Sequence, residues 1–353
     1  MVEVAGRKIG GTEPVFITLE AGPTHDGLES ARRLAAHVAA SGADAIKFQI
    51  VDPDRLVADR KMLFKYEVLV DRETGATETV AEPLYDILCR RALTRDEWRD
   101  LRDHCRELGL AFFATAGFVD EIEFLAEIEC DSLKIASADI DHFPLIHYAA
   151  RTGMTIQLDT GHATIGEVET AVDLIRAEGN ERIVIHHCPS GYPAPLDGIN
   201  LRVIDTLKRM FPYPIAFSDH SPGWDMDVAA LVLGADLVEK TITEDRTTRS
   251  IEHIMSLEPG DVAEFVRTMH GVETALGHPR RIMDPEERRA RLANRRSVFL
   301  ARDLPEGHLI TEADLDFRRP GFGLRPAQVD LIVGRSLRRA KRGGDPLALA
   351  DLD

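Results

Sequence analysis

The chain has 353 residues, of which 44% are hydrophobic and 29% are charged, and its formal net charge is −17. This length exceeds a typical single domain and allows an α/β barrel of about 250 residues with a small second domain. The acidic balance argues against nucleic acid as a partner, because phosphate binding needs clustered Lys and Arg. No apolar run approaches the ~18 residues of a membrane span, and the start of the chain lacks the apolar stretch of a signal peptide. We therefore expect a cytoplasmic protein without membrane contact.

The first segment, residues 2–17, contains a Gly-Gly turn and predicts a hairpin that closes the bottom of a barrel. After it, short apolar runs alternate with amphipathic segments of helical length. One such helix ends on Gly42, and another opens with a Thr94–Glu97 capping box and ends on Gly109. The strand-like runs are 15–20, 44–50, 111–116, 132–137, 155–160, 183–188, 214–219 and 236–241. Eight alternating repeats predict an α/β fold of the (β/α)8, or TIM barrel, type.

Polar side chains gather at the C-terminal ends of these runs, and in a barrel all such ends face one rim. Lys47 and Lys134 lie inside apolar runs, where an unpaired ammonium group is costly. We therefore expect an anionic substrate to satisfy both lysines. The other rim positions are Glu20, Gln49, Thr115, Ser137, Asp159, Thr160, His187, Ser218, Asp219, His220, Glu239, Lys240 and Thr241.

The barrel rhythm stops near residue 275, which gives a first domain of residues 1–275 with the N-terminal hairpin. Residues 276–294 contain a proline and a dense run of charges, and they predict a linker or connecting helix. Residues 295–353 contain short strand-like pieces with several Gly and Pro residues, and they predict a small β-rich domain. A domain of this size often needs a partner surface for stability.

Several stretches resemble the sialic acid synthase family over almost the whole chain. The family condenses phosphoenolpyruvate (PEP) with an N-acetylhexosamine-type aldose, giving a nonulosonic 2-keto-3-deoxy acid and phosphate. The resemblance implies this PEP-dependent synthase activity and a C-terminal antifreeze-like (SAF) domain. It rests on LEAGPTHDG, SGADAIKFQ, LKIASADI, LDTGHATIGEVETAV, HCPSGYPAP, NLRVIDTLK, FSDHSPG and MSLEP in the barrel, and on RRSVFLARDLPEGHLITEADL and RRPGFGL in the small domain.

The resemblance also assigns roles to single residues. Glu20 corresponds to the acid/base carboxylate, and Arg319 to an arginine that the SAF domain inserts into the barrel of the partner subunit, with Arg318 as the competing candidate. That arginine implies a domain-swapped homodimer. The acceptor sugar would contact Gln49, Asp139, Tyr192 and Glu252, and PEP would contact Lys47, Thr115, Lys134, Ser137, Ser190 and Ser218.

One pair of positions departs from the family. Its two metal-binding histidines correspond to His220 and Thr241, and a hydroxyl is a poor ligand for manganese compared with imidazole. Three alternatives remain open. A Mn or Mg ion binds through a substitute such as Asp159; or His220 works without metal as a protonated donor; or the metal step is lost. Further possible substitutes are His187, Glu239 and His253.

Other departures lie in the same region. Thr24 and Asp26 replace asparagines of the family, while Pro189 and Gly191 stand where hydroxyl or amide residues are common. Together they suggest a changed acceptor. Two further positions differ from the family: Asp159 stands where serine is common, and Glu252 stands where the family usually has a shorter acid. Two other functions stay open: a barrel aldolase or lyase acting on a related keto-acid without PEP, and a catalytically silent sugar-phosphate-binding protein. The lyase is disfavoured because a substrate without phosphate would leave Lys47 and its neighbours unpaired.

Overall fold

The computed structural model describes residues 1–353, which form two compact units, Met1–Gly277 and His278–Asp353. Each unit has its own hydrophobic core and is described by itself. No helix of the chain is both long and apolar enough to span a membrane.

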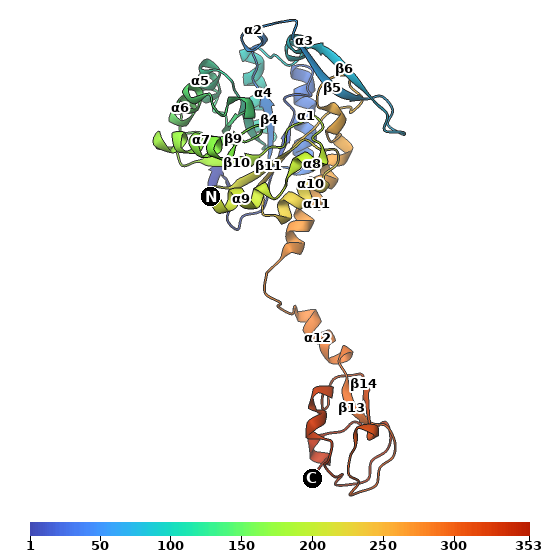
Figure 1. The fold of residues 1–353 in the computed structure, drawn as a ribbon. Helices are drawn as coiled ribbons and strands as arrows, with labels where there is room; N and C mark the ends of the chain where they lie inside the picture. Colours follow the sequence, from blue (N-terminus) through green and yellow to red (C-terminus); the bar gives the residue numbers. More distant parts are fainter. The chain divides into compact units, whose positions relative to one another are not determined.

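The first unit is a closed barrel of eight parallel strands (Figure 1), which confirms the predicted fold. Each strand lies within two residues of its predicted ends. Around the barrel the order is β10, β11, β12, β3, β4, β7, β8 and β9. The bounds are β3 Phe16–Glu20, β4 Ala45–Gln49, β7 Ala111–Thr115, β8 Ser132–Ile135, β9 Thr155–Asp159, β10 Ile183–His187, β11 Ile215–Asp219 and β12 Leu237–Thr241.

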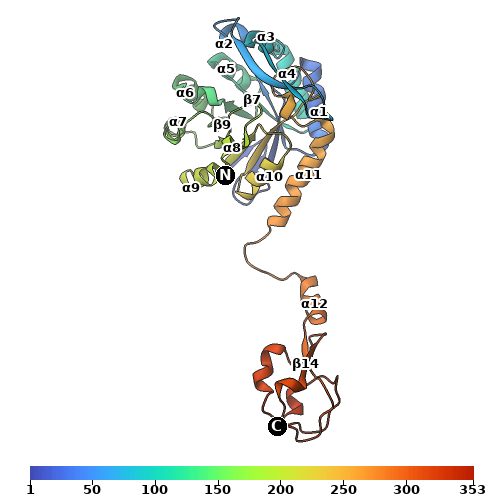
Figure 2. The same cartoon turned by 45° about the vertical axis from the view of Figure 1, so that its right-hand side comes forward.

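Helices cover the outside of the barrel, and both views place α5, α6 and α7 next to one another around it (Figures 1 and 2). The predicted helix before Gly42 is α1, and the predicted capping box of Thr94 and Glu97 opens α4. The bounds are α1 Leu28–Ser41, α4 Arg95–Glu107, α5 Val119–Glu127, α6 Phe143–Arg151, α7 Ile165–Ala177, α8 Leu196–Ile199, α9 Val203–Met210, α10 Asp225–Val232 and α11 Pro259–Leu276.

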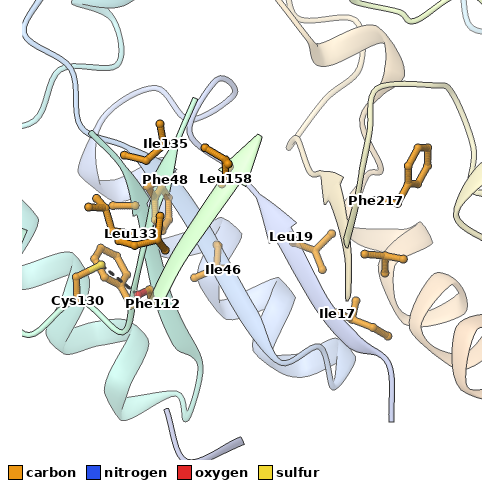
Figure 3. Packing of buried hydrophobic residues seen from close by; sticks show 14 of the residues in the cluster. Ile17, Leu19, Ile46, Phe48, Phe112, Cys130, Leu133, Ile135, Leu158 and Phe217 are labelled. Atoms are coloured by element: carbon orange, nitrogen blue, oxygen red, sulfur yellow. Dashed lines mark hydrogen bonds between the residues drawn. The ribbon is translucent and has the colours of Figure 1, made fainter. Parts of the chain in front are cut away.

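The two faces of each strand have different neighbours because side chains alternate along a strand. The outward-facing side chains, such as Ile17, Leu19 and Phe112, pack in the main core between strands and helices (Figure 3). The inward-facing side chains near the strand starts, such as Phe16 and Phe113, form a second core. Towards the strand ends, the same inner face becomes polar, which places the candidate site inside the rim.

The N-terminal hairpin closes the end of the barrel opposite that rim. Its strands are β1, Val2–Val4, and β2, Arg7–Ile9, and their side chains complete the inner core at the strand starts. The predicted hairpin is present, but β1 and β2 are joined by Ala5 and Gly6, both with positive φ, and the Gly-Gly pair, Gly10 and Gly11, turns the chain after β2.

An insertion between β4 and α4 was missed from sequence. It consists of α2 Pro53–Leu56, a two-stranded hairpin of β5 Leu63–Leu69 and β6 Thr77–Pro83, and α3 Leu84–Cys89. The hairpin stands apart from the barrel strands (Figure 1). Most of its side chains are exposed or half-buried, so it lacks the continuous apolar pattern of a buried strand.

The second unit begins with α12, Pro285–Asn294, and is otherwise built from short pieces. The strands β13, Ser297–Leu300, and β14, Leu315–Arg318, pair antiparallel, and several isolated bridges join its loops. Its separate core contains ten buried apolar residues, among them Val298, Leu300 and Ile332. The division between the units falls at Gly277, near the expected end of the barrel, and α12 lies within the segment expected to link the two domains.

Candidate functional site

A cavity of about 240 Å³ opens inside the rim where the barrel strands end. Its walls come from the last inward-facing residues of the strands and from the loops that follow them. The lining residues are Glu20, Lys47, Gln49, Thr115, Ala136, Ser137, Ala138, Asp159, Gly161, His162, Cys188, Pro189, Ser190, Tyr192, Ser218, His220, Glu239 and Glu252.

Two ammonium groups and three carboxylates form the charged centre of this cavity. Oε1 of Glu239 accepts hydrogen bonds from Nζ of Lys47 and Nζ of Lys134, each at 2.6 Å. Lys47 also pairs with Glu20, while Nζ of Lys134 lies 3.0 Å from Oδ1 of Asp159. Because the five residues come from five strands, only the closed barrel brings these charges together.

The network fixes most of these charges. Burial raises the pKa of Glu239, but Lys134 and Lys47 outweigh it and hold that pKa well below its usual range. Burial opposes the charge on Lys134, yet Asp159 and Glu239 raise its pKa above the ordinary value. For Lys47, burial is the largest influence and lowers the pKa, because the charge of Glu239 offsets only part of the effect of burial. Lys47 is therefore the lysine whose charge depends most on its partners.

The expectation that an anionic substrate must satisfy unpaired lysines was wrong, because each lysine already lies between two carboxylates. An anion that enters the cavity has to compete with Glu20, Asp159 and Glu239 for the ammonium groups. A phosphate-free substrate would therefore not leave the lysines unpaired.

Glu20 ends β3, and its carboxylate is held at both oxygens. Oε1 accepts a hydrogen bond of 2.6 Å from the backbone N–H of Gly22, and Oε2 pairs with Lys47. A Cβ atom on Gly22 would lie 2.6 Å from Oε1 of Glu20 and 2.5 Å from the side chain of Gln49. The absence of a side chain at Gly22 thus allows Glu20 and Gln49 to occupy adjacent parts of the cavity wall.

His220 follows β11 and faces the ring of Tyr192, with 4.8 Å between the ring centroids. Its Nδ1 lies 3.1 Å from the carbonyl oxygen of Pro189, which makes Nδ1 the donor and leaves Nε2 with a lone pair. Burial lowers the pKa of His220 to about 4, so the imidazole is neutral at pH 7. A role as a protonated donor does not fit this state.

The side chains present do not fit a metal held by the protein alone. Across residues 1–353, no group of three His, Cys, Asp or Glu side chains is arranged to hold a metal ion. Thr241 is buried and does not line the cavity, and Asp159 faces Lys134. His220 therefore offers a single nitrogen.

Glu252 reaches the cavity from the loop after β12. It has a left-handed backbone, with φ at 69°, and its side chain is buried. Burial raises the pKa of Glu252 to about 7, although Lys47 and Arg91 act in the opposite direction. In contrast to Glu239, this carboxyl group carries a proton for part of the time at neutral pH.

Comparison with known proteins gives this arrangement a context. Residues 34–281 match the model of the NeuB family, and residues 295–353 match that of the SAF domain. The chain belongs to the NeuB family. This membership confirms the resemblance that the sequence motifs indicated.

Relatives of known name extend over nearly the whole chain. It is 32% identical to the N,N'-diacetyllegionaminic acid synthase of Legionella pneumophila, over 94% of this chain and 95% of that protein. It is 31% identical to the human N-acetylneuraminate-9-phosphate synthase, over 94% and 91% respectively. The structure of an N-acetylneuraminic acid synthetase from Leptospira borgpetersenii, in complex with citrate, superimposes with a TM-score of 0.71 at 31% identity and covers 82% of this chain and 94% of that one.

Most of the site residues expected from the NeuB-family motifs line the cavity. Lys134 is absent from the lining but contacts Glu239 and Asp159, which belong to it. Asp139 lies outside, in the short helix Ser137–Asp139, where it approaches His142. Arg319 belongs to the second unit.

Several alternative metal ligands proved to have structural partners. His187 contacts the carbonyl oxygen of Ile199 at 2.6 Å, and His253 contacts the hydroxyl of Thr243 at 2.6 Å. Neither lines the cavity, nor do Thr24 and Asp26. Of the departures from the family, Asp159, Pro189, Gly191 and Glu252 are therefore the ones at or beside the cavity.

Glu239 was underrated at the sequence level. It lies two residues before Thr241, so both face inward, yet only its contacts with two lysines from other strands make it central. The period of two along β12 could have placed it inside the barrel. His162 and Cys188 were also missed: His162 lies two residues beyond the end of its strand run, and Cys188 is the last residue of its run.

Proposed function

We propose that the chain condenses PEP with an aldose-type acceptor, an N-acetylhexosamine or a close analogue, to give a nonulosonic 2-keto-3-deoxy acid and phosphate. The observation that carries the proposal is the pair of buried ammonium groups, Lys47 and Lys134, beside a cavity lined by four serine and threonine hydroxyl groups. The named relatives, which are acid synthases, support the same activity. The four hydroxyls belong to Thr115, Ser137, Ser190 and Ser218.

In this reaction PEP binds against the lysines and the hydroxyls. The ammonium groups provide charge-assisted hydrogen bonds to phosphate and carboxylate oxygens, and the hydroxyls provide neutral ones. Because Glu20 and Asp159 hold the lysines in the free protein, PEP takes over ammonium contacts from these carboxylates. Glu20 is thereby released from Lys47 and becomes available to accept a proton.

The bonds change in three steps. C3 of PEP attacks the carbonyl carbon of the acceptor, the C–C bond forms, and the carbonyl oxygen takes up a proton. Water adds to the cationic C2 and loses a proton to Glu20, which acts as the base. The C2–O bond to phosphate then breaks, and the C2 hydroxyl becomes the keto group while its proton leaves with phosphate.

The acceptor contacts the part of the cavity beside the charged centre. Gln49, Tyr192 and Glu252 line this part of the cavity. Asp159 adds a carboxylate where the family pattern has serine, and Glu252 carries its carboxylate one methylene further than the shorter acid of the family. We propose that this favours an acceptor that offers hydroxyl donors to carboxylates, so the enzyme would turn over N-acetylmannosamine slowly.

The functional assembly is a domain-swapped homodimer in which Arg319 reaches the partner's cavity. Arg319 is exposed and has no ion-pair partner in the chain, while Arg318 pairs with Asp316 at 2.6 Å, which favours Arg319. Charge also supports the assembly. The barrel unit carries 48 acidic and 27 basic side chains, whereas the second unit carries 12 and 16. The net negative barrel unit of one chain therefore attracts the net positive second unit of another.

The test is release of phosphate from PEP against a panel of aldoses, with and without a chelator. Release with at least one aldose and formation of the keto acid would support the proposal. Release that a chelator abolishes would point to an ion bound with the help of the substrate, and release that persists would point to proton chemistry by side chains alone. No release with any aldose would contradict the proposal and favour the lyase or silent alternatives.

A further inference from the structure

We infer that Glu252 is the general acid that protonates the carbonyl oxygen of the acceptor as the new C–C bond forms. The inference rests on the proposed function and adds to it the origin of one proton. Glu20 and Glu252 would then divide the proton transfers, with Glu20 as the base toward water and Glu252 as the acid toward the acceptor.

The position of Glu252 suits an acid for the acceptor. The residue is 7% exposed and lines the cavity, and no protein group donates a hydrogen bond to its carboxyl oxygens. The nearest fixed contact is through its backbone, where the hydroxyl of Ser256 donates to the carbonyl oxygen at 2.7 Å. A buried carboxyl without a protein partner is costly unless a ligand completes its hydrogen bonds.

The backbone supports the same interpretation. Glu252 adopts a left-handed conformation that non-glycine residues rarely occupy, at a cost of about 1 kcal/mol or more. The surrounding loop holds this conformation through Ser256 and through the short helix His253–Met255 that follows. Such strain is found where a side chain must point in one direction.

No other acidic group of the cavity combines a raised pKa with a carboxyl that has no lysine contact. Glu20 pairs with Lys47, and Glu239 is ionised. Burial also raises the pKa of Asp159, but its carboxylate is held by Lys134 at 3.0 Å. The Nδ1–H of His220 is donated to the carbonyl oxygen of Pro189. Burial is the largest influence on the Glu252 carboxyl and raises its pKa to about 7, while the charges of Lys47, Arg91 and Lys134 act against it and that of Glu239 acts with it.

Tyr192 is the neighbouring alternative. The pKa of its phenol lies far above the ordinary value. The charge of Glu252 is the main cause, and burial is the second. General acids work best when their pKa lies near the working pH. Glu252 meets this condition and Tyr192 does not.

The proton balance closes. When C3 of PEP bonds to the carbonyl carbon, the π electrons move to the carbonyl oxygen, which takes the proton of Glu252 and becomes a hydroxyl. Glu252 is left as a carboxylate and regains a proton from solvent. The proton that Glu20 removes from water returns to solvent, so both groups are reset for the next turnover.

The test compares Glu252→Gln and Glu252→Asp with the wild type, and Glu264→Gln, on the exposed face of α11, is the matched control. The assay is phosphate release from PEP with the aldose of the panel that reacts fastest. We expect Glu252→Gln to lower kcat at least ~100-fold, since general acids contribute about 10²- to 10⁴-fold. Glu252→Asp, which keeps an ionisable proton, should retain more activity than Glu252→Gln. The control should match the wild type.

A pH profile separates proton donation from mere contact. The wild-type kcat should fall as pH rises through about 7, and Glu252→Gln should lack this limb. PEP binding by Glu252→Gln, measured by calorimetry, should stay within about threefold of the wild type, which also reports that the variant is folded. Three results for Glu252→Gln would overturn the inference and leave the proposed function intact: an unchanged kcat, a raised KM for the acceptor as the only effect, or a kcat that still falls as pH rises through about 7. A wild type that releases no phosphate with any aldose would overturn the proposed function as well.

Discussion

Glu239 controls the charge of the cavity at the residue scale. A single oxygen lies 2.6 Å from two ammonium groups, and the hydroxyl of Ser218 donates to the same oxygen at 2.8 Å. Without this carboxylate, two buried cations would face each other. Its role is therefore to keep Lys47 and Lys134 charged and close together, ready for an anion.

Glu239→Gln should convert PEP binding into a pH-dependent property. Removing the negative charge lowers the pKa of Lys47, which burial already lowers, so Lys47 loses its proton as pH rises. We expect the KM for PEP to rise about tenfold or more at pH 8.5 and to change by less than about threefold at pH 6.5. Steady-state kinetics across this range measure it, with Glu264→Gln as control. An increase of KM that is equal at both pH values would indicate a lost contact rather than a lost charge.

Glu252 should also leave a mark on stability. A carboxyl whose pKa is raised in the folded state contributes stability that is complete below its ordinary pKa of 4.5 and is lost as pH rises through about 7. Relative to Glu252→Gln, the wild type should lose about 3 kcal/mol of unfolding free energy between pH 4.5 and pH 8. Urea unfolding of both proteins across this range provides the measurement. A difference that does not vary with pH would show that Glu252 has an ordinary pKa.

At the scale of elements, the loop after β3 depends on a residue without a side chain. A Cβ atom on Gly22 would lie 2.7 Å from the backbone nitrogen of Gln49 and 2.6 Å from Oε1 of Glu20. The backbone of Gln49 cannot move aside at low cost. Gly22→Ala should therefore displace both residues and lower kcat/KM for PEP about 100-fold. Gly117→Ala, at the end of β7 where nothing lies within 4 Å, is the matched control and should match the wild type. Equal activity of the two variants would refute the steric argument.

Strand and helix patterns predicted the barrel closely, because buried parallel strands and amphipathic helices have distinct periods that are visible in single segments. The hairpin of β5 and β6 was missed since its exposed strands lack buried runs. Pairing of the lysines was missed for another reason. Lys47, Lys134 and Glu239 lie 87 or more residues apart in sequence, and the barrel alone decides which carboxylate meets which ammonium group.

Charge is divided unevenly at the scale of the whole molecule. The barrel holds the large acidic excess, and the second unit holds the surplus of basic side chains. The proposed dimer makes use of this division by bringing a basic unit to an acidic barrel. Since part of that attraction is between exposed charges, raised salt should weaken it.

Mixing two inactive variants tests whether Arg319 serves the partner's cavity. Arg319→Ala impairs the second unit, and Glu20→Gln impairs the barrel. Each variant alone should lose most of its activity. When the two are unfolded together and refolded in equal amounts, half of the dimers are mixed, and each mixed dimer pairs one intact barrel with one intact Arg319. About a quarter of wild-type activity should return, as the symmetry of a two-fold exchange requires. Arg318→Ala in place of Arg319→Ala serves as the control and should be active without mixing. If the mixture stays as inactive as its components, Arg319 acts within its own chain or not at all.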